Sequence, residues 1–487
     1  MKNAIPAKPV TEDVANRDAT RRTEIARIFE AQRETALRWR TSSAAQRILR
    51  IRRLHDAVLD WRGRIEQAGF KDFRKPPEEV ALAELMPVIA EARDAMRSLR
   101  TWMRPRHVMP SRMMLGTRSW IRPEPKGRCL IISPWNYPLN LTLGPLVSCL
   151  AAGNTAIIKP SEMTPHLSAV MAGIIAELFP ENEVALLQGD ATLASALLEL
   201  PFDHIFFTGS PAIGKVVMAA AARNLSSVTL ELGGKSPTIV DADADVRLAA
   251  RATIWGKFSN NGQTCIAPDH VYVHASVKDA FSQECVLALT ASYGATAQQQ
   301  LDSLMLARVV DTRHTGRIAA LLDDATARGA RVLFGGAVQL ADCFVQPTLL
   351  TDVPADASIM QEEIFGPVLP IIAFDDLEQV IGRINAQPKP LALYIWGKNR
   401  QRIKQVLDNT SAGGSCINDC MVQYLHGHLP FGGVNHSGIG SAHGWHGFKA
   451  FSHERPIVHT RLHMARMFFP PYGKMTRRIL NLMLRIL

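Results

Sequence analysis

The spacing of hydrophobic positions changes along the chain. Residues 1–100 contain few glycines and space their apolar residues as helices do. Beyond them, short apolar runs alternate with helical stretches. Continuous apolar strands separated by helices predict a parallel sheet covered on both faces. The expected strands are "RCLIIS" (128–133), "NTAIIK" (154–159), "EVALLQG" (183–189), "HIFFTG" (204–209) and "SVTLEL" (227–232).

A second alternating unit extends from about Pro237 to Cys420, with apolar runs in "PTIVDA", "HVYVHA", "RVLFGG" and "LALYIWG". It predicts another α/β domain. The turn residues of "VMPSRMMLGTRSWIRPEPKG" predict a hairpin arm at about 109–127. The Gly- and His-rich stretch after residue 420 is expected to return to the first domain. The expected divisions are therefore 1–232, 233–420 and 421–487.

One stretch has the length of a membrane span, because no charged residue occurs from Cys129 to Ile158. However, Pro134, Pro138 and Pro145, together with several asparagines, interrupt it. The pattern predicts a buried strand, loop, helix and strand rather than a transmembrane helix.

Composition excludes several classes of protein. The net charge of +10 comes largely from arginines near both ends, and the N-terminal ones alternate with Glu, which is typical of a solvated helix face. We therefore expect no nucleic-acid partner. Seven cysteines do not suggest a disulfide framework, and Cys416 and Cys420 have no second pair to complete a metal site. The polar N-terminus lacks the apolar stretch of a signal peptide, so a cytoplasmic location is expected.

Candidate chemistry begins with the polar residues that follow the expected strands, because ligands bind at the carboxyl ends of parallel strands. These residues include Asn136, Lys159, Ser210 and Glu231. Further along, "FSNNGQTC" (258–265) surrounds Cys265 with amides and a flexible glycine. By itself, this pattern fits either a nucleophile or a buried core thiol. Likewise, Asn136 taken alone could be an ordinary turn residue, and Glu231 taken alone could cap a helix or form an ion pair.

Seven fragments occurring in order resolve these alternatives. They are "SPWNYPL" (133–139), "NTAIIKPSE" (154–162), "FFTGSPAIGK" (206–215), "LELGGKSP" (230–237), "NGQTC" (261–265), "EEIFGP" (362–367) and "PFGG" (430–433). Together they resemble the aldehyde dehydrogenase superfamily over roughly residues 45–460. "FDHIFFTG", "MQEEIFGP", "KPLALY" and "SHERP" are most similar to the class 3 branch and to coniferyl aldehyde dehydrogenases.

The resemblance implies an α/β fold of two Rossmann-like domains with an oligomerisation arm. Residues 1–232 would bind the dinucleotide, 233–420 would form the catalytic domain, and 421–487 would supply the return segment, part of the arm and a tail. A homodimer is expected.

For the reaction, the resemblance implies that Cys265 attacks the aldehyde carbonyl and forms a thiohemiacetal and then a thioester. Asn136 and the Cys265 backbone N–H would stabilise the oxyanion. Glu231 would act as general base for hydrolysis, which argues against members that transfer the acyl group to coenzyme A.

The cofactor implied is NAD or NADP. Lys159 and Glu162 would hold the adenosine ribose, and the turn with Gly209, Ser210 and Gly214 would receive the pyrophosphate at a helix N-terminus. Glu363 would hold the nicotinamide ribose. The same resemblance places Trp135 and Phe365 beside the cofactor.

Departures from the family pattern occur at "GVNHSG" (433–438) and "NDCMVQYLHGH" (418–428), which leaves the substrate open between medium- or long-chain aliphatic and aromatic aldehydes. The histidines from His426 to His463 are interpreted as surface and packing residues. Two rival functions are a cysteine hydrolase without redox chemistry and a non-catalytic membrane-associated protein on the same fold. Neither explains Lys159, Ser210 and Glu363 together with Cys265 and Glu231.

The tail "KMTRRILNLMLRIL" (474–487) is expected to form an amphipathic helix with Arg477, Asn481 and Arg485 on one stripe. It is too short to span a bilayer. Two interpretations follow: the helix packs on protein as part of a dimer arm, or it makes peripheral contact with an anionic membrane surface.

Overall fold

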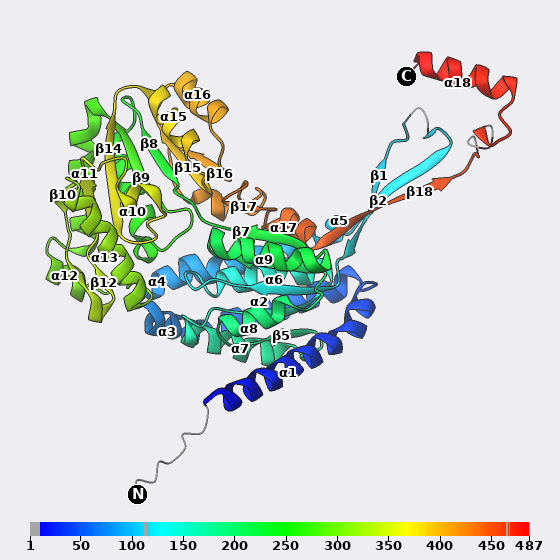
Figure 1. The fold of residues 1–487 in the computed structure, drawn as a ribbon, viewed down its shortest axis with the longest axis horizontal. Coiled ribbons are helices and arrows are strands. Elements are labelled where there is room, and N and C mark those ends of the chain that lie inside the picture. Colours follow the sequence, from blue (N-terminus) through cyan, green and yellow to red (C-terminus); the bar gives the residue numbers. More distant parts are fainter. Residues whose placement is uncertain (1–9, 112–113, 464–465, 467, 487) are drawn as a thin grey trace, which may run out of the picture.

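The computed structural model describes residues 10–111, 114–463, 466 and 468–486. Two α/β units lie side by side, and a narrow arm extends away from them (Figure 1). The two units and the arm are the fold class expected from the sequence.

The first sheet has six strands in the order β17-β7-β6-β3-β4-β5. All neighbouring pairs are parallel except β17 with β7, which is antiparallel. Apolar residues of the strands face helices on both sides, which explains their continuous hydrophobic pattern. The strands are β3 (Arg128–Ile132), β4 (Thr155–Lys159), β5 (Val184–Leu186), β6 (His204–Thr208), β7 (Ser227–Glu231) and β17 (Gly438–Ile439).

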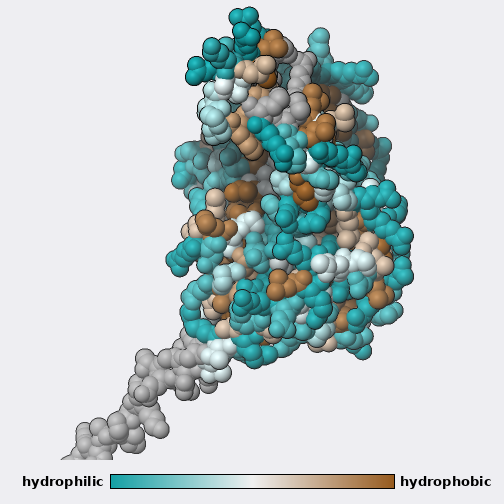
Figure 2. Space-filling view, turned by 90° about the vertical axis from the view of Figure 1, so that its right-hand side faces the viewer, coloured by the Kyte–Doolittle hydropathy of each residue, from teal (hydrophilic) through white to brown (hydrophobic). Residues whose placement is uncertain are grey.

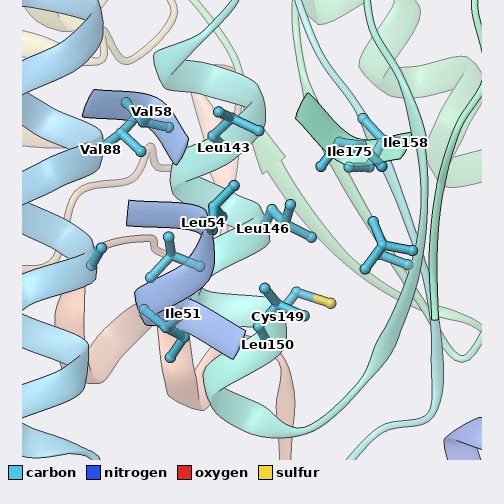
Figure 3. Packing of buried hydrophobic residues seen from close by; sticks show 14 of the residues in the cluster. Ile51, Leu54, Val58, Val88, Leu143, Leu146, Cys149, Leu150, Ile158 and Ile175 are labelled. Atoms are coloured by element: carbon cyan, nitrogen blue, oxygen red, sulfur yellow. The ribbon is translucent and has the colours of Figure 1, made fainter. Parts of the chain in front are cut away.

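One face of this sheet packs on the helices that contribute most of the largest core cluster. In Figure 3, Leu54 of α2, Leu146 and Cys149 of α6 and Ile158 of β4 point toward a shared interior. The other face packs on α1, α8 and α9. The helices on the two faces are α1 (Val10–Trp39), α2 (Ala44–Asp60), α3 (Arg62–Phe73), α4 (Pro77–Val80), α5 (Met86–Trp102), α6 (Asn140–Ala152), α7 (Pro165–Leu178), α8 (Ala191–Leu198) and α9 (Pro211–Asn224). One π-helical turn, Ala81–Leu85, joins α4 to α5.

The second sheet has seven strands in the order β10-β13-β14-β9-β8-β15-β16. Its strands are β8 (Pro237–Val240), β9 (His270–His274), β10 (Arg331–Phe334), β13 (Thr348–Thr351), β14 (Val368–Phe374), β15 (Ala392–Trp396) and β16 (Gly414–Ile417). A two-stranded sheet of β11 (Val338–Gln339) and β12 (Phe344–Val345) lies apart. The accompanying helices are α10 (Val246–Phe258), α11 (Lys278–Tyr293), α12 (Ala297–Asp302), α13 (Thr312–Ala327), α14 (Ser358–Gln361), α15 (Leu377–Ala386) and α16 (Arg400–Asn409).

The arm is a three-stranded antiparallel sheet in the order β1-β2-β18. Its strands are β1 (Arg106–Val108), β2 (Thr117–Pro125) and β18 (Ser452–Thr460). Helix α17 (Gly444–Ala450) precedes β18, and the terminal helix α18 (Lys474–Ile486) lies beyond the arm. Among the described residues, every helix is too short or too polar to cross a membrane.

Some of these elements differ from those expected from the sequence. "RVLFGG" was grouped with an alternating parallel unit, whereas β10 pairs antiparallel with β13 at the sheet edge. The strand expected to reach residue 189 ends at Leu186. The first arm strand lies at Arg106–Val108, ahead of the expected arm, and its side chains are exposed, so no apolar alternation marks it.

Candidate active site

The turn that carries Cys265 follows α10 and has an unusual backbone. Asn260 (φ 50°), Asn261 (φ 54°) and Gly262 (φ 76°) are consecutive and all have positive φ. A Cβ on Gly262 would lie 2.3 Å from the carbonyl oxygen of Gly366. Asparagine tolerates the left-handed region and glycine removes the clash, which explains the "NNG" before the cysteine. The turn brings Cys265 out of the helix and against the segment that follows Glu363.

The side chain of Asn136 lies against this turn. Its amide nitrogen donates to the carbonyl of Gln263 at 2.9 Å, and its own backbone carbonyl accepts from the Asn260 amide at 2.8 Å. The Lys75 ammonium also donates to that carbonyl, at 3.2 Å. Asn136 is 3% exposed. The loop after β3 is therefore fixed to the cysteine turn by hydrogen bonds in both directions.

Behind Asn136 lies a buried ion pair that the sequence did not indicate. Lys75 and Glu84 are both 0% exposed, with Nζ 3.0 Å from Oε1. The other Glu84 oxygen accepts from the Asn140 backbone N–H at 3.0 Å. Glu79 accepts from the Asn260 backbone N–H at 3.2 Å, and burial raises the pKa of Glu79 to about 7. Nothing in "RKPPEEVALAEL" (74–85) distinguishes these residues from surface charges, because their role depends on contacts distant in sequence.

Glu231 ends β7 and is 5% exposed. Among the described residues, neither carboxylate oxygen has a hydrogen-bond partner. Burial raises the pKa of Glu231 well above its usual range. The interpretation of Glu231 as a helix cap or ion pair is therefore wrong. A buried carboxyl group without a partner is costly, and such groups concentrate at functional sites.

Two cavities meet at Cys265. The inner cavity, of 40 Å³, is lined by Glu231, Thr208, Glu91 and His443 as well as the cysteine. The entry cavity, of 200 Å³, is mostly apolar and is also lined by Cys265. Its walls include Leu82, Pro87, Trp255, Ile266, Tyr293 and Leu425.

The Cys265 side chain is partly exposed. Burial, followed by the charges of Glu363 and Glu231, raises the pKa of the thiol above its usual range. A thiolate is the reactive form, so the thiol must lose its proton before it attacks.

Glu363 approaches the segment after β7 through a gap left by glycine. A Cβ on Gly233 would lie 2.3 Å from a Glu363 carboxylate oxygen. Burial and the charge of Asp269 raise the pKa of Glu363 to about 8. The Trp135 and Phe365 rings also meet, 5.3 Å apart and nearly perpendicular. The segment 363–365 and the loop after β3 therefore lie together.

Lys235 and Asp269 support this segment and were not singled out in the sequence. The Lys235 ammonium contacts the Asp269 carboxylate and donates to the carbonyls of Ile359 and Glu362 at 2.8 and 2.9 Å. Asp269 accepts from the Ile364 backbone N–H at 2.9 Å. "GGK" at 233–235 thus contributes a structural lysine.

The remaining predicted residues lie at the carboxyl ends of β4 and β6. Lys159 ends β4, and its ammonium lies 2.6 Å from the Glu162 carboxylate. Ser210 caps α9 and accepts from the Ile213 backbone N–H at 3.4 Å, directly after Gly209. A Cβ on Gly214 would lie 2.7 Å from Leu232, so this glycine allows α9 to pack closely on the sheet.

These residues fit a dinucleotide. The N-terminus of α9 offers backbone N–H groups to an anion, and the Lys159–Glu162 pair stands at the adjacent strand end, where ribose hydroxyls can be bound. Glu363, Phe365 and Trp135 stand nearer the cysteine.

Comparison with known proteins agrees with this arrangement. Residues 4–457 match the model of the aldehyde dehydrogenase family. The rat protein "Aldehyde dehydrogenase family 3 member A2" is 42% identical over 373 residues, covering 77% of this chain and 73% of the relative. A Pseudomonas aeruginosa protein named "Probable coniferyl aldehyde dehydrogenase" is 37% identical over 456 residues, covering 93% and 94% of the two chains.

Among solved structures, the substrate-bound state of Staphylococcus aureus AldH superimposes with a TM-score of 0.89. It is 37% identical and covers 94% of this chain and 99% of that one. The chain belongs to the aldehyde dehydrogenase family. It is an NAD(P)-dependent aldehyde dehydrogenase, and its similarity to class 3 and coniferyl aldehyde dehydrogenases is confirmed.

Proposed function

We propose that Cys265, Asn136 and Glu231 carry out the oxidation of an aldehyde to its carboxylic acid. The observation that carries this assignment is the inner cavity, where an unpartnered, buried Glu231 faces the same space as Cys265. The two residues come from different domains, so only the folded chain brings them together. A carboxyl group poised beside a cysteine suits a base that acts on water after the thioester forms.

In the proposed sequence, the Cys265 thiolate adds to the aldehyde carbonyl and forms a thiohemiacetal. The Asn136 amide and the Cys265 backbone N–H stabilise the oxyanion. The hydride acceptor would be supplied by NAD(P), held by the cofactor-binding residues proposed below. Glu231 then removes a proton from water, the water oxygen attacks the thioester, and the acid leaves as the Cys265 sulfur is released.

For cofactor binding, we propose that Lys159 and Glu162 hold the adenosine ribose and that Gly209 and Ser210, at the start of α9, receive the pyrophosphate. Gly214 contributes by allowing α9 to lie close to the sheet. Glu363 would orient the nicotinamide ribose, with Trp135 and Phe365 flanking it. The close approach of Glu363 to Gly233 supports this, because Gly233 lies two residues after Glu231, beyond the end of β7.

The entry cavity supports an apolar substrate. Its walls combine aliphatic and aromatic side chains, and Trp255 and Leu425 are 42% and 51% exposed, which places them toward solvent. Medium- or long-chain aliphatic and aromatic aldehydes fit such a wall better than charged semialdehydes do. A panel of these aldehydes, ranked by kcat/KM, tests the proposal; preference for a carboxylate-bearing aldehyde would contradict it.

We further propose a homodimer formed through the arm. Strand β18 is nine residues long and lies at the edge of a sheet that projects from the body. A long exposed edge is a template for pairing with another chain. Figure 2 views the molecule from the arm side and shows hydrophobic residues among hydrophilic ones toward the top, where the arm and its end lie.

Helix α18 leaves an apolar face in solvent within the single chain: Met475 and Leu482, two turns apart on the same side of the helix, are 69% and 59% exposed. We propose that this face packs on the partner subunit. Deletion of 474–487 should then lower the oligomer mass, and the intact protein should not sediment with anionic vesicles. Salt-sensitive vesicle binding that disappears with the tail would instead establish peripheral membrane contact. A cytoplasmic location is part of the proposal and is supported by seven unpaired cysteines.

The experiment that tests the catalytic assignment compares Cys265→Ala with Cys343→Ala, a partly exposed cysteine outside the site. Aldehyde-dependent reduction of the cofactor should vanish in the first and persist in the second, while both bind the dinucleotide. Turnover by the Cys265→Ala protein would refute the assignment.

A further inference from the structure

The inner cavity holds more polar groups than the two catalytic side chains. Three of its buried oxygens, both of Glu231 and the Thr208 hydroxyl, have no hydrogen-bond partner among the described residues. A water needs about 10–15 Å³, so 40 Å³ can hold more than one. Unpartnered polar atoms around such a space can be satisfied by water.

The far wall of this cavity is built around His443, whose backbone is strained. His443 has φ 72° and ψ 134°, a combination that side-chain-bearing residues rarely adopt. Such conformations persist only where the surroundings impose them, and they concentrate at functional sites. The strained backbone of His443 is therefore a second indication, separate from the cavity, of a functional role.

Glu91 of α5 imposes that conformation. Both of its oxygens accept from the Gly444 backbone N–H, at 2.9 and 3.1 Å, and one also accepts from the Ser148 hydroxyl at 3.2 Å. The same carboxylate lies 3.6 Å from His443 Nδ1. Tyr424 and Phe431 pack edge-on against the imidazole with centroids 4.7 and 5.4 Å away. The ring is thus fixed beside a carboxylate and remains 14% exposed to solvent.

The other groups near this ring are limited. From α5, Asp94 lies beside Glu91, and its carboxylate is 4.0 Å from the exposed His428 imidazole. Tyr424 contributes a phenol from the loop before the cavity, and Cys265 and Glu231 face His443 across the cavity. Among the described residues, Glu91 is therefore the carboxylate nearest to the imidazole.

We propose that His443, supported by Glu91, relays to solvent the proton that Glu231 removes from water during hydrolysis of the thioester. The inference rests on the proposed role of Glu231. The water oxygen bonds to the acyl carbon, the C–S bond breaks, and the water proton passes to Glu231. It then moves through cavity water to the His443 imidazole, which loses it to solvent, so that Glu231 is again a carboxylate for the next turnover.

The two cavities that meet at Cys265 have different linings, which agrees with this route. Trp255 and Leu425 line the entry cavity, whereas Glu231 and His443 line the inner cavity, and Cys265 lines both. The acyl chain and the hydrolytic water can therefore approach the thioester from different sides. His443 acts through water and Glu231, and we accordingly regard it as a relay residue.

The test measures the burst of reduced cofactor and the steady-state rate in His443→Asn and His443→Gly, with His436→Asn as the exposed control. Asparagine and glycine both accept positive φ. The burst should keep its amplitude and rate, while the steady state falls roughly tenfold or more. Added imidazole should restore the steady state of His443→Gly, which a purely structural loss would not allow. His436→Asn should behave normally.

Glu91→Gln retains an acceptor for Gly444 and removes the charge beside the ring, so it provides a second variant. The pH dependence of the steady-state rate of Glu91→Gln should differ from that of the unsubstituted protein, while the burst is preserved. Unchanged steady states in both His443 variants would overturn the relay, as would loss of the burst. Glu231→Gln distinguishes failure of the proposed base from failure of the relay. If Glu231→Gln hydrolyses the thioester normally, the proposed function fails. If Glu231→Gln hydrolyses it slowly but both His443 variants behave normally, only the relay is overturned.

Discussion

Replacement of Lys75 by Met should damage the protein in two separable ways. The substitution leaves the Glu84 carboxylate at 0% exposure with the Asn140 and Leu139 backbone N–H groups beside it but no counter-charge. Removing one partner of a buried ion pair costs about 3–5 kcal/mol. The second effect is on Asn136, whose carbonyl keeps the Asn260 amide but loses the ammonium donor.

The pH dependence of this loss has a definite sign. Burial raises the pKa of Glu84, and Lys75 opposes that rise. Without Lys75, Glu84 is neutral in the folded protein over a wider range, and the folded state binds a proton that the unfolded state has released. Stability should therefore fall as pH rises above the ordinary carboxyl range. The loss in Lys75→Met should be greater at about pH 8 than at about pH 6.

The double variant Lys75→Met/Glu84→Gln separates stability from positioning. Removing both charges is often close to neutral for stability, so the free energy of urea unfolding should recover most of the loss. The burst of reduced cofactor should stay roughly tenfold slow, equivalent to about 1.4 kcal/mol, because the Asn136 carbonyl still lacks its charged donor. Lys71→Met, an exposed lysine on α3, is the control. If Lys75→Met were no less stable than Lys71→Met, the assigned burial energetics would be wrong; if the double variant also regained its burst, the positioning argument would fail.

Other predictions concern the catalytic and cofactor residues. Cys265→Ala should abolish aldehyde oxidation without loss of dinucleotide affinity by titration. Glu231→Gln should give a stoichiometric burst followed by a steady state roughly a hundred- to ten-thousand-fold slower; rapid hydrolysis without a burst would remove Glu231 from its role. NAD should serve at least as well as NADP, because the Glu162 carboxylate would repel a 2′-phosphate, and inert NAD would contradict this. Glu363→Ala should slow hydride transfer in stopped flow more than it weakens binding.

The sequence allowed the prediction of the fold and of the residues that follow strands. Continuous apolar runs identified the parallel strands, and polar residues at their ends identified Asn136, Lys159, Ser210 and Glu231 as candidates. These signals are local, so they can be read from a few adjacent positions. Their functional roles stay predictions until the substitutions are made.

What could not be predicted depends on contacts between distant segments. Lys75 matters because it reaches Asn136, and Glu91 matters because it fixes Gly444, more than three hundred residues away. His443 was interpreted as a surface or packing histidine; its partial burial, its positive φ and its place in the inner cavity became visible only in three dimensions. Likewise, the antiparallel direction of the edge strand β10 is defined only by its pairing with β13.

The strand that carries Glu231 would lie at the edge of the first sheet without β17. Gly438 pairs with Glu231 and Ile439 with Leu230, and the Leu232 N–H donates to Ser437. During synthesis, about two hundred residues must be added between Glu231 and this partner, which takes on the order of ten to forty seconds at 5–20 residues per second. Throughout that interval Glu231 lies on an unpaired edge strand. A nascent chain that already contains Cys265 therefore lacks the strand pairing beside Glu231, and a chain that stops before residue 437 never acquires it.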